Sequence, residues 1–134
     1  MFTGLSIHWG RIVVAAILSE VAVMAVLGIV FMTHRYLIAP GRTSAEYDAF
    51  VHRASYYVAP TAAGFAVFFA AIWAARSLTT DFFLNGALVG VISVVLTIGF
   101  LFVARPGERA MYGVSYLLRL VGGCAAGVLA QHLA

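Results

Sequence analysis

Four stretches of about 20 residues, almost free of charge, constrain this chain more than any other feature. They run over about 12–33, 54–75, 82–104 and 110–132. A helix needs about 20 apolar residues to cross roughly 30 Å of hydrocarbon, and lipid excludes any span with unpaired backbone groups. Because the runs are long and do not alternate in polarity, they predict helices and not the strands of a barrel.

The composition excludes an ordinary soluble domain, since 63% of the 134 residues are hydrophobic and only 10% are charged. A water-soluble fold of this size leaves too much surface exposed to hide so much apolar area. We therefore predict an all-α fold, a transmembrane bundle of four antiparallel helices with short turns. A short interfacial helix is expected before the second span. Residues 1–134 are expected to form a single integral membrane domain.

The connections between the predicted spans differ in length. Asp81 lies in a tight turn before the third span and is a candidate to cap that helix. Pro106 and Gly107 mark an equally compact turn before the fourth span. The first connection is longer, and its Thr43-x-x-Glu46 pattern is typical of a capping box. The mixed polar and apolar residues that follow indicate the interfacial helix.

Arginines are distributed unevenly over the two faces that this topology defines. The terminal face holds both chain ends and the turn 76–81, and the loop face holds residues 34–53 and 105–109. Two arginines belong to the terminal face and five to the loop face, namely Arg11 and Arg76 against Arg35, Arg42, Arg53, Arg105 and Arg109. The positive-inside rule therefore predicts cytoplasmic loops 34–53 and 105–109, with the N- and C-termini outside. All six tyrosines lie at or near the loop face and both tryptophans at the terminal face, as interfacial belts do.

Glu20 and Arg119 are the charged residues inside the predicted spans. Ionisable groups in hydrocarbon are costly and normally face a partner or water. Glu20 lies about nine residues from the terminal end of its helix, and Arg119 about nine residues from the loop end of its own. At 1.5 Å per residue, each is about 13 Å from one surface of a roughly 30 Å core. The two residues are therefore expected at similar depth, as an intramembrane charged pair.

The helical face around Arg119 is small and polar. It includes Tyr116 and Ser115, which we expect to support the pair, together with Gly122, Gly123 and Gly127. Gly86 and Gly90 form a comparable face on the third span. Small residues let helices approach closely, so these five glycines are predicted helix-packing positions. One interpretation of the pair is purely structural, fixing how the first and fourth spans pack. The other is a proton- or ion-coupled site in which Glu20 titrates and Arg119 tunes it.

Motifs for other chemistry are not visible in the sequence. Cys124 is the sole cysteine, and the four histidines lie near helix ends or in loops without ligand spacing, so neither a metal site nor a haem is expected. No protease, transferase or cofactor motif is present, and we expect no enzyme activity. The net charge is +3, and the arginines that supply the positive charge lie singly at the ends of apolar runs, which argues against nucleic-acid binding.

The opening Ile7-His8-Trp9-Gly10-Arg11-Ile12, followed by Glu20, resembles the start of small, uncharacterised bacterial four-helix integral membrane proteins. The resemblance covers mainly the first helix. It implies a multi-pass protein of the bacterial inner membrane and brings no activity with it.

Two classes of function stay open from the sequence. The first is a non-enzymatic accessory or self-associating component of a membrane assembly, in which the glycine faces bind other helices. Its partners would be the lipid bilayer and a homo-oligomer or larger membrane complex. The second is a small proton- or ion-coupled transporter or channel built on Glu20 and Arg119.

Overall fold

The computed structural model describes residues 7–76, 78, 80–103, 107 and 109–133, and all regular structure within them is helical. The all-α prediction is therefore confirmed. The elements are the helices α1 (Trp9–Thr33), α2 (Ser44–Ala75), α3 (Phe82–Thr97), α4 (Gly99–Val103) and α5 (Arg109–Leu133), and the π-helix η1 (His34–Ile38).

Four helical segments are long and apolar enough to cross a membrane. They are Trp9–Ile38, Ser44–Ala75, Phe82–Val103 and Arg109–Leu133. Large apolar side chains on their outward surfaces are exposed, among them Met24, Ile29, Phe65 and Phe69. In water this exposure would be unfavourable, but hydrocarbon is an apolar solvent. The fold thus defines a multi-pass membrane protein.

The first connection is shorter than the sequence predicts. α1 continues through η1 to Ile38, and α2 begins at Ser44 and runs unbroken to Ala75, so the segment predicted as a short interfacial helix is not a separate element. The predicted capping box is confirmed, because the Glu46 amide donates to the Thr43 hydroxyl and the Thr43 amide to the Glu46 carboxylate. The Tyr47 hydroxyl donates to the Ala39 carbonyl at 2.9 Å, which ties the loop to α2.

The third span is not a single helix, because α3 ends at Thr97 and α4 begins at Gly99. At its start, Asp81 holds the N-cap position, but the predicted side-chain cap is wrong. The Asp81 backbone is left-handed, with φ 57°, whereas a capping side chain needs an extended backbone to reach the first free amides. The turn predicted over 105–109 lies largely outside the described residues.

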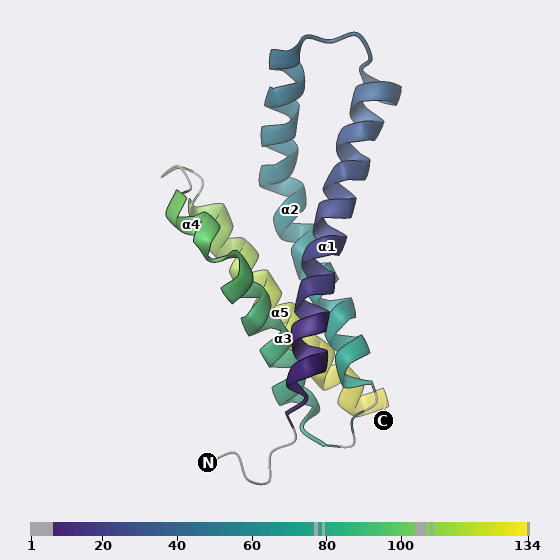
Figure 1. Cartoon of the computed structure of the whole chain (residues 1–134), viewed down its shortest axis with the longest axis vertical. Helices are drawn as coiled ribbons and strands as arrows, with labels where there is room; N and C mark the ends of the chain where they lie inside the picture. The colour runs from purple at the N-terminus through teal and green to yellow at the C-terminus, as the bar shows by residue number, and fades with distance from the viewer. Residues whose placement is uncertain (1–6, 77, 79, 104–106, 108, 134) are drawn as a thin grey trace.

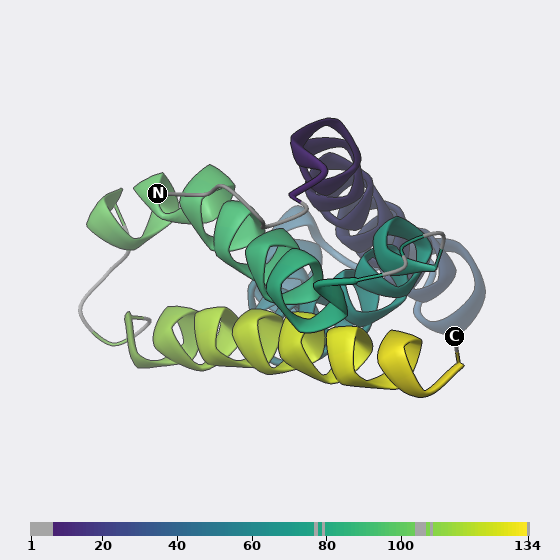
Figure 2. The ribbon, with the colours of Figure 1, turned by 90° about the horizontal axis from the view of Figure 1, so that it is seen from below.

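The helices divide into two groups that diverge toward one end of the molecule (Figure 1). The start of α1, the α2–α3 connection and the end of α5 lie together at the terminal face. The loop between η1 and α2 lies at the opposite, loop face. α5 packs against both α2 and α3, and Figure 2 shows it lying alongside α3. Toward the loop face, the distance between α1 and α2 on one side and α3 and α5 on the other increases.

The terminal half of the molecule is closed by a core of small and β-branched side chains. Its central members are fully buried or nearly so, and we call them the packed half: Ile12, Ala15, Val67, Ala71, Ala74, Val89 and Ala126. Arg11 closes the end of this core, because its guanidinium donates to the carbonyls of Trp73 and Ala74 at 2.7 and 3.1 Å. These carbonyls belong to the last turn of α2, where a cation is favourable.

Candidate functional site

Glu20 of α1 and Arg119 of α5 form an ion pair between Oε1 and Nη1. The structure therefore brings together the two charged residues that depth arithmetic places at a similar level. Their side chains differ in accessibility, since Arg119 is 7% exposed and Glu20 is 24% exposed. Arg119 is thus withdrawn between the helices, while Glu20 stays accessible from one side.

Ser93 of α3 is a third member of this site. Its hydroxyl donates to Glu20 Oε1 at 2.8 Å and accepts from Arg119 Nη1 at 2.6 Å. Ser93 is fully buried, so these bonds replace the water that would otherwise solvate the pair. The sequence places Ser93 on the small face of the third span, one turn after Gly90, but that face predicts packing and not a polar contact. Its position at the depth of the pair was the available signal.

The two residues predicted to support the pair behave differently. Ser115 lies one turn before Arg119 on α5, and its hydroxyl accepts from Arg119 Nε at 3.4 Å. The Tyr116 hydroxyl donates instead to the Thr97 carbonyl at 2.9 Å. The helix break explains this, since the Leu101 amide donates to the Ile98 carbonyl, one residue short of the helical pattern. The Thr97 carbonyl at the end of α3 is therefore satisfied by Tyr116.

The five predicted helix-packing glycines all lie where two helices of this chain meet. A Cβ at Gly86 would lie 2.5 Å from the Gly123 carbonyl oxygen, and one at Gly127 would lie 2.7 Å from Phe83 Cα. At Gly90 a Cβ would lie 2.7 Å from the carbonyl oxygen of Arg119 itself. Gly122 packs in the same way against Gly64 of α2. Close backbone approach therefore sets where α5, and with it Arg119, lies.

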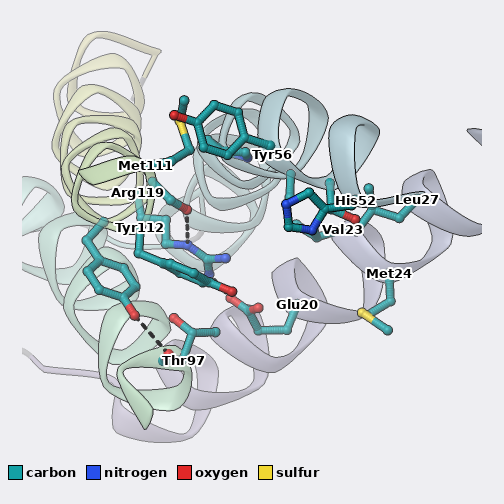
Figure 3. A pocket seen from close by; sticks show the side chains of 15 residues that line it. Glu20, Val23, Met24, Leu27, His52, Tyr56, Thr97, Met111, Tyr112 and Arg119 are labelled. Atoms are coloured by element: carbon teal, nitrogen blue, oxygen red, sulfur yellow. Dashed lines mark hydrogen bonds and ion pairs between the residues drawn. The ribbon is translucent and has the colours of Figure 1, made fainter. Parts of the chain in front are cut away.

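A cavity of about 300 Å³ opens beside the pair, between the diverging helix groups (Figure 3). Its apolar walls are formed by Val23, Met24, Leu27, Ala59, Pro60 and Met111. Its polar lining is Glu20, His52, Ser55, Tyr56, Thr97, Tyr112, Ser115, Tyr116 and Arg119. The volume is at the lower end of the range for small-molecule sites, and such a mixed lining is typical of them.

The cavity extends from the charged pair toward the loop face. α1 contributes residues from Glu20 to Leu27, and α2 contributes residues from His52 to Pro60. Met111 and Tyr112, at the start of α5, line the same end as His52. On the other side of the pair, side chains of the packed half such as Val67 and Val89 are fully buried. The site is thus open toward one face and closed toward the other.

Sequence reasoning missed most of this lining. The sequence predicts Tyr56 and Tyr112 as members of an interfacial belt and His52 as an interfacial histidine. His52 is exposed. These residues line one cavity only because the helices diverge, and the sequence carries no signal of that divergence. Within the described residues, no group of three His, Cys, Asp or Glu side chains is placed to hold a metal ion.

The fold and the site together define a multi-pass membrane protein with a charged, hydrogen-bonded site at the base of a cavity between its helices. In comparisons with protein-family models, curated proteins and solved structures, nothing matches the chain.

Proposed function

We propose that the protein is a small proton- or ion-coupled transporter whose solute occupies the cavity beside Glu20 and Arg119. One observation carries the proposal: a buried ion pair stands at the base of a cavity of about 300 Å³ and presents its carboxylate to that cavity. Ionisable groups at this depth are costly, and in membrane proteins they commonly mark ion or substrate paths. A purely structural pair has no need of an accessible carboxylate.

The arrangement of open and closed ends supports the same proposal. A transporter exposes its site to one side of the membrane at a time, by moving one group of helices against another. Here α1 and α2 diverge from α3 and α5 toward the loop face and lie close to them at the terminal face (Figure 1). The close glycine contacts between α3 and α5 hold these two helices together as one group, whereas the contact of Gly122 with Gly64 of α2 lies between the two groups.

The position in the cell is part of this proposal. Following the resemblance of the first helix, we place the protein in a bacterial inner membrane with four antiparallel crossings. The arginine distribution puts loops 34–53 and 105–109 in the cytoplasm and both termini outside. The first turns of α2 then lie at the cytoplasmic interface, and the cavity opens to the cytoplasm. A cysteine-accessibility measurement at Ser44 in intact cells and in inverted vesicles tests this orientation.

The experiment for transport uses the full chain reconstituted in proteoliposomes with an imposed pH gradient. The wild-type protein should dissipate the gradient in the presence of a transported solute, measured with an entrapped pH dye. Glu20→Gln should abolish this flux, because the variant keeps the side-chain shape but not the titratable group. Asp48→Asn is the matched control, since Asp48 is an exposed carboxylate of α2 that does not line the cavity. Equal flux in wild type and Glu20→Gln would refute the proposal.

The accessory or self-associating interpretation has less support here than it has from the sequence alone. The glycine faces that favoured it are occupied within the chain, by α3 against α5 and by α2 against α5. A homo-oligomer or larger assembly therefore has to use other surfaces. Measuring the mass of the detergent-solubilised protein by light scattering tests self-association, and a stable oligomer without any flux would favour this interpretation.

A further inference from the structure

Glu20 and Arg119 both line the cavity, and the negative member of the pair is the more exposed one. Glu20 is more than three times as exposed as Arg119, at 24% against 7% of the side chain. Arg119 is also engaged by its neighbours, since Nη1 donates to Glu20 and Ser93, and Nε donates to Ser115. The carboxylate is therefore the more accessible of the two charges for a solute in the cavity.

The carboxylate retains capacity to accept hydrogen bonds. Arg119 and Ser93 both contact the same oxygen, Oε1. A carboxylate offers about four lone-pair sites on two oxygens, so the second oxygen, Oε2, can accept from a ligand without breaking the pair. Such a bond is strongest when the donor is charged. The complementary group is therefore a cation that carries N–H donors.

The remaining walls suit the other parts of such a ligand. Tyr56, Tyr112 and Tyr116 line the cavity, and aromatic faces attract cations. Met24 and Met111 lie among the apolar residues of the lining, and methionine adapts to ligands of varied shape. A cavity of about 300 Å³ limits the ligand to a compact molecule.

We propose, building on the transport function above, that the solute is a small protonated primary amine with an apolar body, whose ammonium group donates to Glu20 Oε2. Bound in this way, the amine competes with a proton for the same carboxylate. Binding of one then excludes the other at Glu20, which is the property that exchange of an amine for a proton requires.

The test compares four probes that share a phenylethyl body by calorimetry on the detergent-purified full chain. They are 2-phenylethylamine, its trimethylammonium analogue without N–H donors, neutral 2-phenylethanol and anionic 3-phenylpropanoate. We expect 2-phenylethylamine to bind at least about tenfold more tightly than the other three, because it alone combines charge with N–H donors. Tighter binding of the anion, the alcohol or the trimethyl analogue would overturn the inference.

Two variants locate the binding. Glu20→Gln should remove the preference for the amine over the alcohol, and a retained preference would contradict the proposal. Ala59→Leu fills the cavity without touching the pair and should abolish binding in a folded protein. Ala49→Leu is its control, since Ala49 is an exposed alanine of the same helix. Unchanged binding in Ala59→Leu would place the amine elsewhere.

The transport function and the amine inference fail in different ways. If another probe is transported in a Glu20-dependent manner and the amine is not, the inference is wrong and the transport function stands. If none of the four probes binds but Glu20-dependent proton flux is measured, the amine inference is again wrong. If neither binding nor flux depends on Glu20, both proposals fall.

Discussion

The two halves of this molecule are built from the same four spans but from different side chains. The packed half, toward the terminal face, consists of small and β-branched residues that are almost fully buried. The open half, defined by the residues that line the cavity, carries tyrosines, methionines and polar groups. Small residues let helix backbones approach, whereas large aromatic residues keep them apart. Side-chain size along each helix therefore sets where the bundle is closed and where it opens.

Glu20, Ser93 and Arg119 lie at the boundary between these halves. This position explains their unequal exposure, because Arg119 and Ser93 lie among packed helices and Glu20 borders the cavity. A charged pair within the packed half would be inaccessible, and one nearer the loop face would be solvated. At the boundary the pair is buried enough for its geometry to be fixed and still lines the cavity. Four experiments test whether the two halves differ in this way.

The largest effect is expected from breaking the charged pair. Glu20→Leu leaves the buried Arg119 uncompensated and should lower the free energy of unfolding by about 3–5 kcal/mol. Arg119→Leu should cost less, because the more exposed Glu20 carboxyl can take up a proton and become neutral. The double variant should recover much of the loss. Unfolding in detergent titrated with dodecyl sulfate measures all three, and equal losses in the two single variants would contradict the boundary position.

A smaller effect is expected from a methyl group at the α3–α5 contact. Gly90→Ala places a Cβ 2.7 Å from the Arg119 carbonyl oxygen and should destabilise the fold by about 1–3 kcal/mol through overpacking. It should also displace Arg119 and weaken Glu20-dependent flux. Gly113→Ala is the control on α5, where an added Cβ meets open space. The same unfolding titration measures this loss, and a Gly90→Ala protein as stable as the wild type would show that α3 and α5 are not closely packed.

A third comparison removes side-chain volume from each half. Val67→Ala should cost roughly 1–2 kcal/mol, because Val67 is fully buried and its removal leaves a void. Leu27→Ala should cost less, although it deletes a larger group, since Leu27 already borders the cavity. Thermal unfolding followed by circular dichroism ranks the two variants. The reverse order would mean that the open half closes around Leu27 in the membrane.

The smallest effect concerns the break between α3 and α4. Tyr116→Phe removes the hydrogen bond to the Thr97 carbonyl and should cost about 0.5–1.5 kcal/mol. Hydrogen exchange of the Leu101 amide should accelerate with it, since the bond anchors the end of α3. Tyr112→Phe is the matched variant one turn earlier on the same helix, and it lines the same cavity. Equal protection in both variants would show that Tyr116 does not hold the break.

Much of the fold was predictable because lipid restricts what a chain can do. Four apolar runs of sufficient length allow only helices, and the capping box at Thr43 marks the start of α2 by local chemistry alone. Helix ends were less predictable. η1 extends α1 beyond its predicted end, and the break at Ile98 interrupts a continuous apolar run. Neither change alters the hydropathy pattern, so neither leaves a clear signal in the sequence.

The candidate site was predictable in part. Glu20 and Arg119 stand out because a charge inside a span demands a partner, and depth along two helices identifies that partner. Ser93 had the right depth, but a small hydroxyl is equally common at packing positions. Tyr116 was assigned to the pair by its proximity along α5, whereas the helix break draws its hydroxyl to Thr97. Local breaks of this kind decide which of two nearby acceptors a side chain reaches.

The sequence alone predicts four apolar helices long enough to cross a membrane, glycines at close helix contacts, and two opposite charges at similar depth. These properties follow from residue type and spacing along single helices. The divergence of α1 and α2 from α3 and α5, and the greater exposure of Glu20 than of Arg119 beside the cavity, depend on the tertiary structure. Divergence depends on how four side-chain surfaces fit together at once, which no single helix specifies.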